Sequence, residues 1–259
     1  MLPAGSRLLL SDPIFYVVSA LAVTFLGLSK GGFLGLGLAA TPLLALRVPP
    51  VQAAAILLPI LLLQDVISVW AYRHHWDAWN LKVLLPGAVI GVAAAWLLAA
   101  KVPEAYVRLA VGLIAVVFVL TRWLGPTRTR AASPTWIGGL FWGALSAFTS
   151  ALAHAGAPPF QVYVLPQRLD KLTFVGTSTI FFAATNLMKA APYFALGQLT
   201  TENLAAAAVM LPLAVLTNFA GIWLVHRTRP ELFFKIAYLM VFIIAIELIR
   251  AGLVTLIHG

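Results

Sequence analysis

Charged residues are scarce in this chain, and cysteine is absent. Of its 259 residues, 10% are charged and 62% are hydrophobic, with 17 Lys or Arg and 8 Asp or Glu. A soluble domain holds about 25% charged residues and must keep most of its surface wetted. The composition therefore excludes an ordinary soluble fold. The absence of cysteine excludes disulfides and thiolate metal sites. A lipid bilayer is the solvent that suits such a chain.

The remaining charge is mostly positive, with a net charge of +9. In a soluble protein this excess would suggest a nucleic-acid partner. Here the basic residues lie in short loops between apolar runs, where positive charge sets the orientation of a membrane protein. We therefore predict a multi-pass protein of the cell membrane (inner or plasma membrane). We expect it to contact the lipid bilayer and not to bind nucleic acid.

The apolar residues form runs long enough for membrane helices. A bilayer core about 30 Å thick needs about 20 residues in a helix. Two shorter runs, Phe33–Leu46 and Ala157–Pro166, follow glycine-rich or proline-rich breaks. Because only Arg7 precedes the first run and no clear cleavage site follows it, we expect a retained helix rather than a signal peptide. The eight long runs are Pro13–Leu28, Val51–Tyr72, Leu81–Ala100, Tyr106–Leu124, Trp136–Ala153, Leu172–Leu196, Asn203–Val225 and Leu232–Leu256.

The second half of the chain repeats features of the first. Pro103-Glu104 corresponds to Pro230-Glu231, 127 positions later. Three further pairs follow in order, namely Pro42 with Pro166, Gln64-Asp65 with Thr185-Asn186, and Pro86 with Pro212. Chance similarity of apolar chains is the alternative, but the ordered series favours internal duplication, which is usual in transporters. We predict a first repeat over 1–126, a polar linker over 127–135 and a second repeat over 136–259.

The loop charges indicate how the two repeats are oriented. If the short runs re-enter without crossing, seven Lys or Arg residues lie on one side of the membrane and nine on the other. If the short runs cross, the split becomes eleven against five. The second split is the one that the positive-inside rule expects. The sequence therefore predicts an all-α polytopic membrane protein with two inverted repeats and both termini outside. It has about ten membrane segments, including two short broken or re-entrant helices.

The two breaks are the first group of candidate site residues. Interrupted helices are tolerated in a membrane only where they are buried in protein or line a cavity. The first break contains Lys30, Gly31 and Gly32, and we expect a helix to begin near Phe33. The second contains His154 and Gly156, followed by prolines suited to a first helical turn. Free N–H groups at a helix start favour an anion. Inverted repeats would let the two starts converge, although glycine at helix contacts is the alternative.

The run Ser29-Lys30-Gly31-Gly32-Phe33, with the later Thr41-Pro42, resembles the glycine-rich signature of the TauE/SafE family of sulfite and sulfonate exporters. The resemblance covers essentially the whole chain. It implies a membrane protein of two halves that exports sulfite, sulfoacetate or a related sulfonate. The second half departs from the family pattern, because His154, Gly156 and two prolines stand where a glycine cluster is usual.

Polar residues inside the apolar runs are the second group of candidates. A charge at bilayer depth is costly and indicates function by default. Asp65 is predicted to couple a proton or to pair with a cation, with a bond to a neighbouring helix as the alternative. Lys189 is predicted to attract the anion or to pair with Asp65, with snorkelling to the interface as the alternative. The uncharged candidates for substrate binding are Gln64, Gln161, Thr177, Ser178 and Asn186, which can otherwise serve as interhelical hydrogen bonds; Asn218 is a further candidate.

No metal or cofactor is predicted. His74 and His75 are adjacent, so they do not face one site, and with Trp76 and Trp79 they are typical of an interfacial belt. The sequence contains no zinc-protease pattern, nucleophile elbow or phosphate-binding loop.

These features together predict a secondary transporter, not an enzyme. It would export a small anion, sulfite or an organosulfonate such as sulfoacetate, by alternating access. A passive anion channel is the first alternative, distinguished by flux that does not saturate. A membrane-embedded enzyme is the second, and it would need a clustered acid, base or metal set at one interface.

Overall fold

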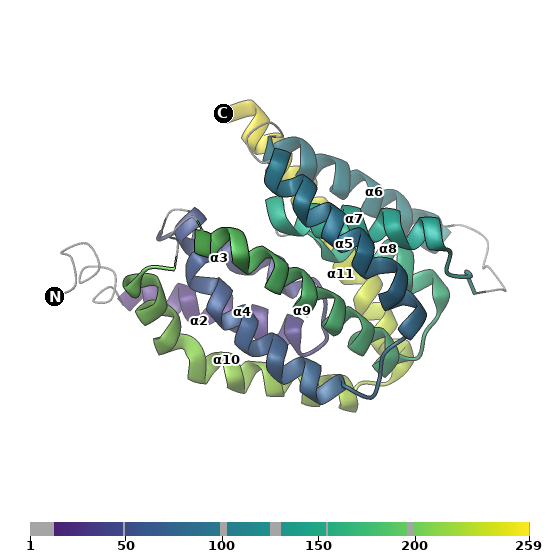
Figure 1. Cartoon of the computed structure of the whole chain (residues 1–259), viewed down its shortest axis with the longest axis horizontal. Coiled ribbons are helices and arrows are strands. Elements are labelled where there is room, and N and C mark those ends of the chain that lie inside the picture. The colour runs from purple at the N-terminus through teal and green to yellow at the C-terminus, as the bar shows by residue number, and fades with distance from the viewer. Residues whose placement is uncertain are drawn as a thin grey trace. The chain divides into compact units, whose positions relative to one another are not determined.

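The computed structural model describes residues 13–48, 50–98, 103–124, 131–153, 155–195 and 199–258. Within these ranges the chain is helical and contains no strand (Figure 1). The all-α prediction is confirmed. Of the predicted linker, residues 131–135 are described and are not helical, and residues 127–130 lie outside the described ranges.

Each predicted apolar run corresponds to a helical element. The short run at 33–46 becomes a 3₁₀ helix η1 (Leu36–Ala39) that continues into α3 (Ala40–Leu44). The short run at 157–166 becomes α8 (Ala157–Val164) followed by the 3₁₀ helix η2 (Leu165–Gln167). The long helices are α2 (Pro13–Lys30), α4 (Pro50–Tyr72), α5 (Ala78–Leu98), α6 (Glu104–Leu124), α7 (Trp136–Ala153), α9 (Lys171–Ala195), α10 (Thr201–Arg227) and α11 (Pro230–His258).

Several long helices begin directly after a polar residue whose side chain accepts a backbone N–H of the first turn. Asp77 Oδ1 accepts the Asn80 N–H (2.7 Å) at the start of α5, and Asp170 Oδ1 accepts the Thr173 N–H (3.1 Å) at the start of α9. Thr135 and Thr200 act in the same way at α7 and α10. Such caps satisfy donors that the helix itself leaves unpaired, and they fix where each helix begins.

The carboxyl of Asp170 lies in the connection before α9, outside the long helices. Partial burial raises its pKa, but hydrogen bonds from Thr173 and Leu172 and the nearby His75 outweigh that effect. The net result is a pKa below the usual range for aspartate. Asp170 therefore caps α9 as an anion, which the helix dipole favours.

The first break differs from its prediction, because no helix begins near Phe33. The helical turn begins three residues later, at Leu36. Gly32 and Gly35 have φ values of 135° and 112°, a backbone region that side chains rarely allow. These two glycines hold the chain out of a helix until Leu36. The second break matches its prediction, since α8 begins at Ala157 with prolines in its first turn.

The described residues form two compact units. Unit 1 comprises the chain up to Ala71 together with Lys189–Arg227, and unit 2 comprises Tyr72–Met188 and Thr228 onward. Unit 1 therefore holds α2, η1, α3, nearly all of α4, the end of α9, and α10. Unit 2 holds α5–α8, most of α9, and α11. Each unit contains helices from both predicted sequence repeats.

Unit 1 is built around a core of aliphatic and small side chains. Phe15, Val23 and Leu26 of α2 pack with Ile56 and other residues of α4, and with α3 and α10. In unit 2, α5 packs along α7 and α6 packs along α11. These pairs can be followed in Figure 1.

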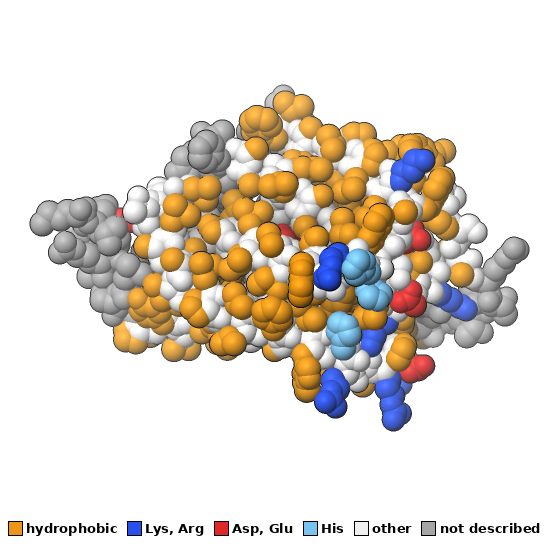
Figure 2. Space-filling view, turned by 60° about the horizontal axis from the view of Figure 1, so that its bottom comes forward, with side chains coloured by type: hydrophobic (Ala, Val, Ile, Leu, Met, Phe, Trp, Pro, Cys, Tyr) orange, Lys and Arg blue, Asp and Glu red, His pale blue; other side chains and the backbone are white. Residues whose placement is uncertain are grey.

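The surface is apolar while polar groups lie inside. Ile137, Leu97 and Ile257 are 81%, 77% and 74% exposed, whereas Gln64, Ser68 and other polar side chains are buried. Figure 2 shows one face covered largely by hydrophobic side chains. Such contiguous apolar surface indicates contact with lipid. Among the described residues, five helices are long and apolar enough to cross a membrane: α2, α4, α5, α10 and α11.

Glycines allow two helices of unit 1 to touch through their backbones. A Cβ atom on Gly31, directly after α2, would lie 2.5 Å from Gly221 Cα of α10, and one on Gly221 would lie 3.1 Å from the Gly27 carbonyl oxygen. Close backbone approach through small residues is the usual way in which helices associate in membranes. The crossing brings the C-terminal end of α2 against α10.

We expect Gly31→Ala to lower the free energy of unfolding by about 1–3 kcal/mol, because overpacking a rigid backbone contact forces the helices apart. Thermal unfolding of the purified protein in detergent checks this. Gly37→Ala is the matched control, since its new methyl group would meet the Ser29 side chain at 3.1 Å, and that side chain can shift. Equal losses from the two variants would contradict a backbone crossing at Gly31.

Candidate functional site

The centre of the candidate site is an ion pair inside unit 1. Lys30 is the last residue of α2, and its Nζ lies 2.5 Å from Asp65 Oδ1 in the middle of α4. The side chains are only 13% and 5% exposed. The end of a helix is a favourable place for a lysine because of the helix dipole. Removing charges from water is expensive unless they are paired, so the pair accounts for how Asp65 is tolerated there.

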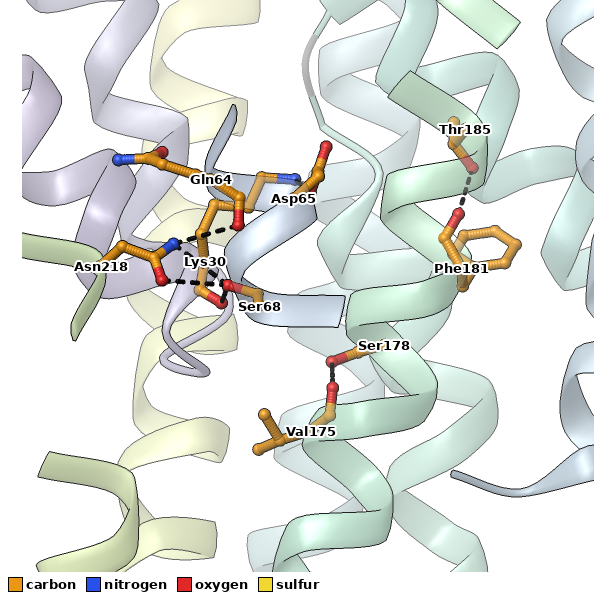
Figure 3. Close-up of polar contacts among 9 residues, drawn as sticks. All are labelled: Lys30, Gln64, Asp65, Ser68, Val175, Ser178, Phe181, Thr185 and Asn218. Carbon is orange, nitrogen blue, oxygen red and sulfur yellow. Dashed lines mark hydrogen bonds and ion pairs between the residues drawn. The ribbon is translucent and has the colours of Figure 1, made fainter. Parts of the chain in front are cut away.

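A hydrogen-bond network fixes the position of this pair (Figure 3). Ser68 Oγ donates to the Lys30 carbonyl (2.8 Å) and accepts from Asn218 Nδ2 (3.0 Å). The same Nδ2 donates to the Gln64 carbonyl (3.3 Å), and Gln64 Nε2 donates to the Ala214 carbonyl (3.1 Å). The network joins α2, α4 and α10 around the ion pair. Within the described part of the chain, the fully buried Gln64 Oε1 has no hydrogen-bond partner.

Lys189 brings a second cation to the same unit. It lies on α9, is 7% exposed, and interacts electrostatically with both Lys30 and Asp65. Its burial excludes the alternative in which it snorkels to the interface. Lys30 makes a direct ion pair with Asp65, so Asp65 is paired with a cation. Lys189 also interacts electrostatically with Asp65, and its predicted pairing with Asp65 stays a prediction.

The cluster Lys30–Asp65–Lys189, which we call the charged cluster, holds two ammonium groups and one carboxylate. With all three ionised its net charge is +1. Among the residues that the structure describes, Asp65 and Lys189 are the charged residues that are buried. A buried excess of positive charge attracts an anion, because an unbalanced charge in an apolar environment is unfavourable.

The structure gives Gly31 and Gly32 a role in ending α2. The N–H groups of Gly31, Gly32 and Phe33 donate to the carbonyls of Gly27, Ser29 and Leu28, at 2.8, 3.1 and 3.1 Å. The last two bonds form the Schellman pattern, with Gly32 at the position that needs a positive φ. These N–H groups are therefore used within the protein, and α3, with five residues, is too short to supply a helix dipole. Lys30 is the group in this break that can attract an anion.

The second break belongs to unit 2. His154 lies outside the described residues. The Gly156 carbonyl accepts a hydrogen bond from Ser146 Oγ (2.7 Å), which ties the break to α7. Gln161 of α8 is fully buried. The predicted convergence of the two breaks remains a prediction.

The other predicted residues lie on α9 in unit 2. Thr177 Oγ1 donates to the Thr173 carbonyl (2.7 Å) and accepts the Asp77 N–H (2.8 Å), so it holds the connection between α4 and α5. Ser178 Oγ donates to the Val175 carbonyl (2.7 Å), a local helix bond (Figure 3). Asn186 is buried, one turn before Lys189.

Ser68 is the site residue that the sequence analysis missed. It lies three and four positions after Asp65 and Gln64, so all three share one face of α4. That spacing was visible in the sequence. Among the described residues, no three His, Cys, Asp or Glu side chains form a group able to hold a metal ion.

We expect Asp65→Asn to lower the free energy of unfolding by about 3–5 kcal/mol, as when one partner of a buried pair is removed. Lys30→Met should cost less, because Lys189 still balances Asp65, whereas Asp65→Asn leaves two like charges together. Thermal unfolding in detergent measures both variants.

The control is Glu247→Gln, which breaks the exposed pair that Glu247 makes with Arg250 on α11 (2.7 Å). Exposed pairs contribute about 0–1 kcal/mol. A loss for Asp65→Asn no larger than that for Glu247→Gln would contradict the assigned role of the ion pair.

Comparison with known proteins identifies the family of this chain. The protein-family model described as "Sulfite exporter TauE/SafE" matches residues 19–248, nearly the whole chain. No curated protein and no solved structure gives a significant match. The matched range contains the charged cluster and the two breaks. It also covers, wholly or for the greater part, the five helices that are long and apolar enough to cross a membrane. The chain therefore belongs to the TauE/SafE sulfite exporter family and is a multi-pass membrane protein.

Proposed function

We propose that this protein is a secondary transporter of the cell membrane that exports a small anion by alternating access. Sulfite or an organosulfonate such as sulfoacetate is the proposed substrate, because the family is one of sulfite exporters. The sequence contains no nucleotide-binding motif, so the energy would come from ion gradients or the membrane potential. An inside-negative potential favours anion exit by about 2.3 kcal/mol per charge for each 100 mV.

The observation that carries the proposal is the net positive charged cluster in unit 1. In membrane proteins, buried ionisable residues mark substrate and proton pathways. Lys30 and Lys189 are the proposed anion-binding groups, and Asp65 is the proposed site of proton coupling. Gln64 is the proposed neighbouring hydrogen-bonding group. The proposed substrate-binding residues of unit 2 are Gly156, Gln161, Thr177, Ser178 and Asn186. The hydroxyls of Thr177 and Ser178 already donate hydrogen bonds to backbone carbonyls.

The helix pairing supports two repeats related by a two-fold axis; the loop charges are the reason to propose that they are inverted and make ten membrane segments. Under the predicted repeat, α2 corresponds to α7, α5 to α10, and α6 to α11. A two-fold axis relating the repeats would convert an α2–α10 contact into an α7–α5 contact and would leave α6–α11 unchanged. All three pairs are among the contacts observed within the units. A short helical element also follows both α2 and α7.

Inverted repeats predict which loops share a side of the membrane. Because the chain lacks cysteine, single-cysteine variants at His74, Thr201 and Thr228 can be labelled selectively with a membrane-impermeant thiol reagent in intact and permeabilised cells. We expect His74→Cys and Thr228→Cys to be protected in intact cells, and Thr201→Cys to be labelled. If the short helices re-enter instead, the side chains at 74 and 228 lie on opposite sides, and this result would contradict inversion.

Transport is tested in proteoliposomes that contain the purified protein, at set voltage and pH gradients, with sulfite, sulfoacetate, other sulfonates, carboxylates and chloride. We expect saturable flux of a sulfur oxyanion that shows counterflow. Lys189→Ala should raise the apparent KM for that anion about tenfold or more, as expected for a lost charge-assisted contact. Glu247→Gln is the control, because its carboxylate belongs to an exposed pair.

The other outcomes separate the alternatives. Flux that does not saturate and shows no counterflow would identify a passive anion channel. Movement of carboxylate or chloride without any sulfur compound would overturn the substrate and leave the transporter. Chemical conversion of the added anion would favour a membrane-embedded enzyme.

A further inference from the structure

We propose that the charged cluster selects its anion by charge: it accepts a monoanion when Asp65 is ionised and a dianion only when Asp65 carries a proton. The inference rests on the proposed function, since it assumes that Lys30 and Lys189 hold the transported anion. It goes further by naming the charge class of substrate and the proton that accompanies it.

The charge count of the cluster is the first support. Lys30 and Asp65 are in direct contact with little exposure, and Lys189 is buried within electrostatic reach of both. Two positive charges and one negative charge leave +1. One negative charge from the substrate brings the sum to zero, whereas two bring it to −1 unless Asp65 is protonated.

Other charged groups of unit 1 are too far away to change this count. On α10, Glu202 and His226 are sixteen residues before and eight residues after Asn218, which contacts the cluster. At about 1.5 Å per residue these separations are about 24 Å and about 12 Å along the helix. Arg227 lies farther still, Arg47 after α3 is exposed, and α2 and α4 contribute no charged residue besides Lys30 and Asp65 in the described ranges.

The donors for an anion are present on Lys30. An ammonium group has three N–H donors, and in the described part of the chain Asp65 Oδ1 is the acceptor found for Lys30 Nζ. The Ser68 bond is made to the backbone carbonyl of Lys30 and does not involve the ammonium group. A tetrahedral or pyramidal oxyanion can therefore bind Lys30 without displacing Asp65.

Low polarity around the cluster makes the charge count decisive. The core of unit 1 next to it consists of aliphatic and small residues such as Ile60, Leu57 and Ala214. Interactions between charges are strong in such surroundings, so a bound anion that leaves a net negative charge favours protonation of Asp65. Whether the substrate is a monoanion or a dianion with a proton, one net negative charge crosses the membrane with each anion. A dianion takes one proton with it and a monoanion takes none.

The test compares methanesulfonate, a permanent monoanion, with sulfate, a dianion of similar size, because neither changes its own protonation near neutral pH. Binding to the purified full-length protein is measured by calorimetry over a range of pH, in buffers with different ionisation enthalpies. The buffer dependence counts the protons taken up on binding.

For the wild type, we expect sulfate to bind with uptake of about one proton and to weaken about tenfold per pH unit where Asp65 is ionised, as one-proton linkage requires. Methanesulfonate should bind with no proton uptake and little pH dependence. In Asp65→Asn, sulfate should bind without a proton and become the preferred anion, because that variant has a net charge of +2. Glu202→Gln removes an acid of the same unit away from the cluster and should behave as the wild type.

Equal proton uptake for the two anions, or an unchanged preference in Asp65→Asn, would overturn the inference, as would a wild type that binds neither. If Asp65→Asn does not fold, the difference in proton uptake between sulfate and methanesulfonate on the wild type still tests the charge rule. If sulfur anions are transported but proton uptake does not differ between sulfate and methanesulfonate, the proposed function stands and the inference is wrong. If proton uptake differs as expected but no anion is transported in proteoliposomes, the cluster selects by charge and the proposed transport function is wrong.

Discussion

The constraint on which this structure depends is the burial of an ion pair in an apolar helical unit. Lys30 and Asp65 stabilise each other there by their direct contact, and Ser68 fixes the backbone of Lys30. Ser68 is in turn bonded to Asn218, so α2, α4 and α10 cannot separate without leaving polar groups unpaired. Lys189 brings a second buried ammonium group to the same unit, within electrostatic reach of Lys30 and Asp65. The proposed binding of an anion depends on this second ammonium group.

Helix packing and the site are parts of one arrangement. The small residues Gly27, Gly31 and Gly221 allow α2 and α10 to approach through their backbones. This contact brings the end of α2, and therefore Lys30, next to the polar face of α4. Gly32 ends the helix directly after Lys30, so the ammonium lies at the C-terminal end of the helix dipole. The glycine-rich signature thus positions a lysine rather than presenting its own N–H groups to a ligand.

Much of the fold could be predicted from the sequence because bilayer thickness sets helix length, and the long apolar runs recur as long helices. The buried ionisable residues were also visible, since Asp65 and Lys189 interrupt apolar runs. The contact between Lys30 and Asp65 was not, because it joins residues 35 positions apart and depends on a helix crossing that no local pattern specifies. The helix expected at Phe33 was wrong because positive φ values at two glycines override the apolar pattern. Thr177 was chosen for its hydroxyl, yet that hydroxyl also accepts a loop N–H, a contact that only the tertiary structure reveals.

We propose that the anion binds at the buried cluster of two lysines and one aspartate. The most direct measurement is an experimental structure with selenate, at mildly acidic pH, in which the selenium atom is located by anomalous scattering. We expect a single strong selenium peak next to Lys30 Nζ and Lys189 Nζ, and its loss in Lys189→Gln. A peak elsewhere in the protein that persists in Lys189→Gln, with none at the cluster, would contradict it.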